Sequence, residues 1–454
     1  IKKLLNIMKK INLNRSMKNL FVLYILLHVI IGANAQNTVG TILLEEEKVD
    51  KGYTLFSPVG SLETFLINNN GEIVNKWSSD YRPGLDVELS SSGKLYRTCR
   101  LEIEGYNHAG KGGRIEIRSW NDSLEWYTEL CFPDSCLHHD ITLLPNGNIL
   151  ALVATKIELP EIIEAGKDTT DMRMKVVWTE SIIEIKPLEN NKSEIVWIWN
   201  AWDHLIQDRF PSVNNYNPDK NNPKKYDINF FPATSTAGDV FHMNSIDYNV
   251  ENDMILLSVK NINEIWVIDH STTLEEAQTA SGGKQKSGGD IIYRWGNPSA
   301  YGQDGAVQID NQHDACWVYH NGKWTGEISI FNNNVKEKES CFLVIKPQLN
   351  RKRNSFLKDK NGQFLSAEIA LNFCPEGIFG GRQCSFQVLS SGNYLFGYSA
   401  KGEIIEYNSK GEIVWRYVNP YSVKGILKEG DPINANTYFK AKKYDLQTFM
   451  KGKI

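Results

Sequence analysis

Short alternations of apolar and polar residues, each broken by a turn, run along most of the chain. The clearest copy is His138-His-Asp-Ile-Thr-Leu-Leu-Pro-Asn-Gly-Asn-Ile-Leu, where two alternating segments flank a Pro-Asn-Gly-Asn turn. Period-two alternation around such a turn is typical of a β-hairpin. Similar phrases begin at Asp86 and Cys384, and looser ones begin at His242 and Gln312. The chain therefore predicts repeated hairpins, and long helical periodicity is scarce.

A second hairpin phrase follows the first kind. Ile404-Ile-Glu-Tyr-Asn-Ser-Lys-Gly-Glu-Ile-Val-Trp is its clearest copy, with relatives at residues 65–77 and 182–197. Two hairpins make a four-stranded sheet, and sheets that cannot bury their own faces stack radially into a propeller. We expect the segment at Phe65 to complete a sixth sheet, the one begun at Cys384. The fold class predicted is all-β, a six-bladed β-propeller with long surface loops; a β-sandwich or two β domains is the alternative.

The composition fits a folded soluble protein and narrows the choice of partner. Of the 454 residues, 41% are hydrophobic and 23% are charged. The 50 basic and 54 acidic side chains leave a net charge of −4. Nucleic-acid binding requires concentrated positive charge, so we exclude nucleic acid as the main partner.

Residues 1–35 predict a secretory signal peptide, and residues 36–454 predict a single propeller domain. A basic segment precedes the apolar run Leu20–Ile31, and Ala33-Asn-Ala35 is a cleavage pattern. Met17 starts a more ordinary signal peptide, and the residues before it fit upstream sequence that is not translated. The apolar run is shorter than the roughly 20 residues of a membrane span, so we expect no stable span, with a short anchor as the alternative. We expect a periplasmic or secreted protein.

All seven cysteines lie beyond the predicted cleavage site. Export permits disulfides, but an odd number of cysteines cannot all pair. Cys131 and Cys136 flank Phe-Pro-Asp-Ser, a turn able to bring them together, and Cys374 and Cys384 are a weaker candidate pair.

Histidines recur at one position of the repeat. When the hairpins are aligned on the turn glycine, His139 coincides with Cys384, and His313 falls in the same register in a looser copy. His242 coincides with His138. Because the first strands of propeller blades line the central channel, we expect these imidazoles to converge on one funnel.

Aspartate or asparagine accompanies each of these histidines, as Asp140, Asp314 and Asn244. Neutral imidazole can be a nucleophile or general base, and cationic imidazole stabilises anionic oxygens. The alternative interpretation is that the polar pairs only stitch neighbouring blades through hydrogen bonds. Converging imidazoles also make a metal site possible, but no HxxE or HExxH spacing joins them, so we assign no metal and no cofactor.

The sequence resembles the bacterial arylsulfotransferase (ASST) family from about Gly52 to Pro420, nearly the whole mature chain. The combination of motifs is specific, whereas a single Pro-Asn-Gly-Asn turn is not. The matching segments are Gly52-Tyr-Thr-Leu-Phe-Ser-Pro, His138-His-Asp-Ile-Thr-Leu-Leu-Pro-Asn-Gly-Asn, Trp202-Asp-His-Leu-Ile-Gln-Asp, His242-Met-Asn-Ser-Ile-Asp-Tyr-Asn, Glu264-Ile-Trp-Val-Ile-Asp-His-Ser-Thr-Thr, Tyr293-Arg-Trp-Gly-Asn-Pro and Gln312-His-Asp-Ala.

The resemblance implies a six-bladed periplasmic propeller that moves a sulfuryl group from an aryl sulfate to a phenol without a nucleotide donor. In the family the group rests transiently on a histidine, with other histidines and an arginine around it. By motif, His242 and His313 match active-site histidines, and His139 matches a motif of closer relatives. We expect these three to be catalytic. The substrate-binding residues expected are His138, Asn244, Asp314, Lys260 and Lys336, although Lys260 also fits a solvated strand end.

One departure from the family's pattern concerns its arginine. At the matching strand end, Phe331-Asn-Asn-Asn is followed by Lys336 and Lys338 and by no arginine. Lysine is a point charge rather than a bidentate fork, so it binds a sulfate with less directionality.

A second departure concerns the family's sulfate-accepting histidine, which lies in the C-terminal part. This chain has no histidine after His320. A two-step route then needs another acceptor. His313 is the first choice because Asp314 beside it can orient the ring, and His139 beside Asp140 is the second.

Two other functions stay open at this point. One is a propeller that binds an anionic or aromatic ligand without catalysis. The other is a metal-dependent hydrolase that uses the same histidines. In the enzyme interpretation the partners are small-molecule aryl sulfates and phenols.

Overall fold

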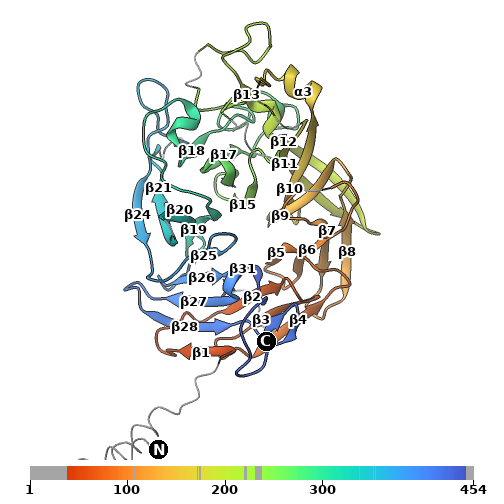
Figure 1. Ribbon diagram of the computed structural model, residues 1–454, viewed down its shortest axis with the longest axis vertical. Helices are drawn as coiled ribbons and strands as arrows, with labels where there is room; N and C mark the ends of the chain where they lie inside the picture. Colours follow the sequence, from red (N-terminus) through yellow and green to blue (C-terminus); the bar gives the residue numbers. More distant parts are fainter. Residues whose placement is uncertain are drawn as a thin grey trace, which may run out of the picture.

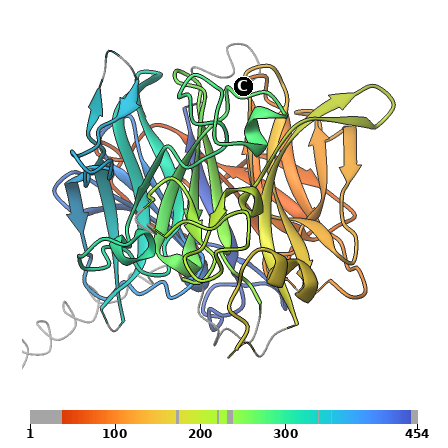
Figure 2. The ribbon, with the colours of Figure 1, turned by 90° about the horizontal axis from the view of Figure 1, so that it is seen from above.

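The computed structural model describes residues 38–445, except residues 107, 171, 173–174, 219–221, 231–237, 337, 351 and 353. The predicted signal peptide lies outside the described residues. Within the described part the chain folds into six antiparallel sheets arranged in a ring, confirming the predicted six-bladed β-propeller (Figure 1). Seen from above, the sheets stand beside one another around the ring (Figure 2).

Each blade has four strands, and the innermost strand comes first in the order below. The first blade is β31 (Tyr438–Tyr444), β2 (Tyr53–Pro58), β3 (Glu63–Ile67) and β4 (Ile73–Ser78). The second is β5 (Pro83–Leu89), β6 (Leu95–Arg100), β7 (Gly113–Arg118) and β8 (Leu124–Glu129). The third is β9 (Ser135–Leu143), β10 (Ile149–Glu158), β11 (Val176–Leu188) and β12 (Lys192–Asn200).

The other three blades follow the same order. The fourth is β15 (Met243–Asn249), β16 (Met254–Val259), β17 (Glu264–Asp269) and β18 (Tyr293–Trp295). The fifth is β19 (His313–His320), β20 (Lys323–Lys336), β21 (Glu339–Lys346) and β24 (Glu368–Phe373). The sixth is β25 (Ser385–Val388), β26 (Tyr394–Tyr398), β27 (Glu403–Tyr407) and β28 (Ile413–Val418), with β1 (Gly40–Leu44) as an additional outer strand.

Short elements decorate the loops between the blades. They are the helix α3 (Leu159–Glu164), the two-residue pairs β13 (Leu205–Ile206) with β14 (Tyr226–Asp227), β22 (Leu349–Asn350) with β23 (Ser355–Phe356) and β29 (Tyr421–Ser422) with β30 (Gly425–Ile426), and several 3₁₀ turns. Among the described residues, no helix is long and apolar enough to cross a membrane.

The hairpin turns that the sequence predicts are present in the structure. In the clearest copy, Leu143 pairs with Ile149, and the N–H of Gly147 donates to the Leu144 carbonyl at 3.0 Å. Gly147 has φ 86°, and Gly392 has φ 85° at the equivalent turn of the sixth blade. Only glycine adopts this backbone region without strain, which is why the repeat is marked by that residue.

The ring closes differently from the prediction. The segment at Phe65 forms β3, and it lies in the first blade rather than completing the blade that begins near Cys384. The C-terminal strand β31 supplies the inner strand of that first blade, with Tyr444 opposite Tyr53. The N-terminal strand β1 pairs with β28 of the last blade. Both ends of the described chain therefore fasten the same junction.

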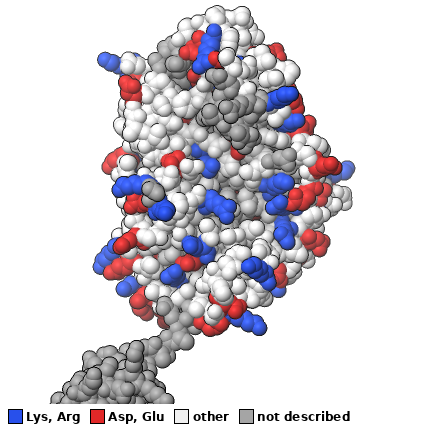
Figure 3. All heavy atoms as spheres, in the orientation of Figure 1, with Lys and Arg blue, Asp and Glu red and all other residues white. Residues whose placement is uncertain are grey.

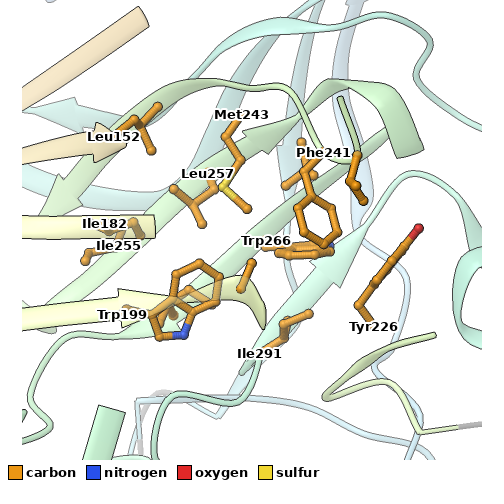
Figure 4. Close-up of a cluster of buried hydrophobic side chains, with 14 of the residues drawn as sticks. Leu152, Ile182, Trp199, Tyr226, Phe241, Met243, Ile255, Leu257, Trp266 and Ile291 are labelled. Atoms are coloured by element: carbon orange, nitrogen blue, oxygen red, sulfur yellow. The ribbon is translucent and has the colours of Figure 1, made fainter. Parts of the chain in front are cut away.

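Apolar side chains fill the spaces between blades. Between the third and fourth blades, Leu152 and Trp199 meet Leu257 and Trp266, all at most 1% exposed (Figure 4). Burying each such side chain contributes roughly 1.5–3 kcal/mol. This packing holds the inner strands at fixed positions around the axis.

Two disulfides are formed among the described cysteines. Cys131 pairs with Cys136, as predicted. The predicted pair of Cys374 with Cys384 is wrong, because Cys374 pairs with Cys341. Cys341 lies on β21 and Cys374 directly follows its neighbour β24, whereas Cys384 is a buried free thiol at the start of β25.

Candidate functional site

The inner strands begin with an unusual backbone. His139, His242, Asp314 and Cys384 have φ of 49°, 50°, 53° and 80°, in four different blades. Non-glycine residues rarely adopt this left-handed region, and such residues concentrate at functional sites. Register shifts accompany them, for example between His313 and Cys316 on β19. A bulge of this kind re-aims the side chains on either side of it.

Four histidine rings gather at this end of the inner strands. The ring centroids of His139 and His242 are 4.8 Å apart, and those of His138 and His139 are 5.0 Å apart. A fourth ring, His108, lies 5.0 Å from His138 and 6.1 Å from His242. The structure thus brings together three histidines predicted from the sequence and one that was not.

His108 comes from the loop between β6 and β7, which lies against β9. The N–H of His139 donates to the Gly110 carbonyl at 2.9 Å, and the backbone of Lys111 pairs with that of His138 in an isolated antiparallel β-bridge. A Cβ on Gly110 would lie 2.1 Å from the His139 ring. The glycine therefore allows the loop to close over the imidazoles. Because this loop has no place in the repeat, the hairpin register gave no signal for His108.

Asp239 joins two of these rings. Its Oδ2 accepts from His242 Nδ1 at 2.5 Å, and its Oδ1 lies 3.2 Å from His108 Nε2. Burial opposes ionisation of this carboxyl, but the contacts with His108 and His242 outweigh burial and lower its pKa. The group is an anion that fixes the orientation of His242. The sequence motifs gave no signal for Asp239, which precedes β15 in an irregular segment.

His242 is the most exposed of the four histidines. Its side chain is 13% exposed, against 1% for His108. Burial lowers the pKa of His242, although the Asp239 carboxylate acts in the opposite direction. A neutral ring that donates Nδ1–H to Asp239 keeps the lone pair on Nε2. This is the arrangement that nucleophilic or general-base catalysis requires.

His313 is engaged at both ring nitrogens. Its Nδ1 lies 2.9 Å from Asn333 Oδ1 and 3.0 Å from the Asn311 carbonyl, both acceptors, so Nδ1 carries the proton. Its Nε2 accepts from the Gln383 N–H at 3.2 Å. Burial lowers the pKa of His313 to about 3. The ring is neutral, and its lone pair is already occupied.

Neither aspartate orients the histidine that precedes it, so that prediction is wrong. Asp314 Oδ2 accepts from the Phe386 N–H at 2.8 Å, and Asp140 Oδ2 accepts from the Ile246 N–H at 2.9 Å. Each bond joins one blade to the next. His139 instead lies 2.8 Å from His138, Nδ1 to Nδ1.

Asn244 also links its blade to the next one through a hydrogen bond. It is fully buried, and its Nδ2 donates to the Gln312 carbonyl at 2.9 Å. The interpretation that polar pairs stitch neighbouring blades therefore holds for Asn244, Asp140 and Asp314. It does not account for His139 and His242, whose rings face one another.

A buried lysine from the closing strand connects two of these aspartates. Lys440 Nζ lies 2.6 Å from Asp140 and 3.0 Å from Asp314. Burial disfavours its charge, but the surrounding carboxylates raise the pKa of Lys440 well above its usual range. Asp314 and Lys440 also line a cavity of about 350 Å³.

The two predicted lysines are in different environments. Burial lowers the pKa of Lys260, and its charge acts on both His242 and His313. The N–H of Lys260 donates to the His242 carbonyl at 3.4 Å, which places Lys260 beside this histidine. The Lys336 side chain is 77% exposed and pairs with Glu339 at 3.5 Å, at the turn between β20 and β21. Figure 3 shows that acidic and basic side chains are intermixed over the face it presents.

Comparison with known structures gives matches of low identity. One is a Bacteroides caccae protein of unknown function, with 11% identity, a TM-score of 0.42, and coverage of 87% of this chain and 99% of the other. A second is a catalytically inactive virginiamycin B lyase from Staphylococcus aureus with quinupristin, with 12% identity, a TM-score of 0.37, and coverage of 84% and 88%. No curated protein matches the sequence.

A family model gives the informative match. The model described as arylsulfotransferase (ASST) matches residues 118–420, which is more than half of the chain. The matched region includes His138, His139, Asp239, His242 and His313. Together with the predicted motifs and the observed propeller, this match assigns the family. The chain belongs to the arylsulfotransferase family.

Proposed function

We propose that the protein transfers a sulfuryl group from an aryl sulfate to a phenolic acceptor, and that His242 carries the group between them. The observation that supports this most directly is the 2.5 Å contact between His242 Nδ1 and Asp239. A carboxylate at Nδ1 holds the imidazole in the tautomer whose Nε2 is nucleophilic. His242 thereby replaces His313 and His139 as the preferred nucleophile.

In the first step, the Nε2 lone pair of His242 attacks the sulfur of the aryl sulfate. An N–S bond forms, the S–O bond to the aryl group breaks, and its electron pair leaves with the phenolate. The imidazole becomes positively charged, and the Asp239 carboxylate stabilises that charge. In the second step, the acceptor oxygen attacks sulfur, the N–S bond breaks, and its electron pair returns to Nε2. The acceptor proton passes to solvent.

The charged oxygens of the sulfuryl group require donors or cations around them. We assign this role to Lys260, whose N–H donates to the His242 carbonyl at 3.4 Å. The family's arginine has no counterpart after Phe331. Asn333 in that segment instead holds His313 through its Oδ1 at 2.9 Å.

The proposal is tested by incubating the protein with a chromogenic aryl sulfate, with and without an added phenol. Sulfuryl transfer gives release of the chromophore that depends on the phenol. Release without the phenol indicates a hydrolase, and no release in either case indicates a binding protein. Either of these two results contradicts the proposal.

The same assay identifies the carrier. His242→Ala should lower turnover by roughly 10²- to 10⁴-fold. His320→Ala, which changes an exposed histidine at the end of β19, is the matched control. Quenching during turnover should place an acid-labile adduct of sulfuryl mass on His242. An adduct on His139 or His313 would move the role to that residue.

A further inference from the structure

We infer that His108, Asp239 and His242 form a binding site for a divalent transition metal, with Zn²⁺ as the best-suited ion. This inference goes beyond the proposed sulfuryl transfer and does not depend on it. It differs from the expectation, drawn from sequence spacing alone, that no metal is bound.

The donor atoms lie close enough to surround an ion. One ligand atom from each of His108, Asp239 and His242 falls within 4.8 Å of the other two. A tetrahedral zinc ion, with bonds of about 2.1 Å, holds its ligand atoms about 3.4 Å apart. The separations must therefore close by at most about 1.4 Å when the ion binds.

Several buried polar atoms in this cluster have no partner. Among the described residues, His108 Nε2, His138 Nε2 and Asp239 Oδ1 are fully buried and make no hydrogen bond. Burying such groups unpaired is costly, and a cluster of them calls for an explanation such as a bound ion. These atoms belong to the same group of rings, since His108 and His138 have centroids 5.0 Å apart.

The hydrogen bond of His108 identifies which of its ring nitrogens is available to a metal. Its Nδ1 lies 2.8 Å from the Ala109 carbonyl, which can only accept, so Nδ1 carries the proton. His108 Nε2 lies 3.2 Å from Asp239 Oδ1. This separation is close to that of two ligand atoms on one tetrahedral zinc ion, so a cation bonded to both atoms fits here.

The outer contacts match those of metal-binding histidines. A ligating imidazole usually donates its other N–H to an acceptor, which fixes the tautomer. His108 does so with the Ala109 carbonyl. His138, the neighbouring ring, lies 2.8 Å from His139, Nδ1 to Nδ1, so its contact is with another imidazole. Two imidazoles and one carboxylate suit Zn²⁺ or Co²⁺ rather than Mg²⁺ or Ca²⁺.

A metal at this position draws a ring nitrogen of His242 into coordination. The metal-loaded state and the covalent route through His242 are then alternative states of one site. Zn²⁺ should therefore inhibit phenol-dependent transfer, and a chelator should restore it.

The test is direct metal binding by the full chain, freed of metal with a chelator and then dialysed. Titration with Zn²⁺ followed by calorimetry should show one tight site per chain. Co²⁺ should give the visible absorption of a four-coordinate ion, a readout that does not require activity. His108→Gln and His242→Gln should each weaken Zn²⁺ binding by roughly 100-fold or more, while His320→Gln should bind as the unchanged protein does.

Two results would overturn the inference. One is a folded, chelator-treated protein that takes up no Zn²⁺. The other is Zn²⁺ binding that both glutamine variants retain. If one variant fails to fold, the other still decides the question. Phenol-dependent transfer by the metal-free protein tests the proposed function separately.

Discussion

His139 and Asp140 are neighbours in the chain, yet their side chains take part in different networks. The His139 ring faces His242 at 4.8 Å, whereas Asp140 bonds to the Ile246 N–H of the next blade. The positive φ of His139 separates the two directions. One bulged residue pair thus serves both the candidate site and the cohesion of the ring.

At the residue scale, Asp239→Asn should abolish most of the sulfuryl transfer. An asparagine at this position can present its N–H₂ to His242 and favour the wrong tautomer, so we expect turnover to fall by roughly 10³- to 10⁴-fold. The measurement is the rate of phenol-dependent release, with thermal unfolding to show that the near-isosteric variant is folded. Full activity in a folded variant would remove Asp239 from the mechanism.

His270 should make stability depend on pH. Burial disfavours its charge, but the hydrogen bonds that the ring donates to Asp253 at 2.8 Å and to Glu184 at 3.0 Å outweigh burial and raise the pKa of His270 to about 9. Because the folded pKa lies above the unfolded value near 6.5, this stabilisation is complete below pH 6.5 and is lost as pH rises through 9. It amounts to about 3 kcal/mol.

The measurement is the free energy of unfolding in denaturant at several pH values, for the unchanged protein and for His270→Gln. The difference between the two should be largest at pH 6 and should shrink between pH 6.5 and 9. A difference that stays constant over this range would show that the ring is not charged in the folded state.

At the scale of elements, the closing strand β31 carries the cation that neutralises two buried aspartates. Lys440→Met leaves Asp140 and Asp314 without it, and breaking a buried ion pair in this way costs about 3–5 kcal/mol. The free energy of unfolding should fall by that amount. Lys424→Met, at an exposed position, is the control and should change little.

The two disulfides should differ in their contribution to stability. Cys341 and Cys374 are 33 residues apart, and Cys131 and Cys136 are 5 apart. From loop-closure entropy, losing the first costs about 3.7 kcal/mol and losing the second about 2 kcal/mol. Unfolding of the double alanine variant of each pair, measured in denaturant, checks this order. Equal losses would contradict the entropic account.

At the scale of the whole molecule, the repeats explain which features the sequence could predict. Alternation around turn glycines predicted the hairpins, and a shared register predicted that His139 and His242 lie together. Ring closure was predicted wrongly, because a pairing between the two ends of the chain has no local signal. The same is true of Cys341 with Cys374.

The remaining parts of the candidate site lie outside the repeat. His108 and Asp239 come from irregular segments, and Lys440 comes from a strand that only the closed ring brings near Asp140. His313 has the predicted register, but Asn333 and Gln383 occupy its ring nitrogens. Register predicts where a backbone position lies, whereas hydrogen bonds made after folding determine what its side chain can do.

The predicted signal peptide is tested on the whole chain expressed in a bacterial host. A basic segment, a short apolar run and the Ala33-Asn-Ala35 pattern favour cleavage after Ala35. Mass spectrometry of the exported protein should find Gln36 at the N-terminus. Recovery of Leu20–Ile31 in the mature form would indicate an anchor instead.

The junction fastened by β1 and β31 has a consequence for biosynthesis. A ribosome releases residues 438–444 only after all the other described strands have been made, so the ring stays open until then. A chain interrupted before β31 lacks this strand, and it also lacks Lys440, the cation that contacts Asp140 and Asp314. The last strand to be made therefore both closes the ring and balances the charge of two buried aspartates.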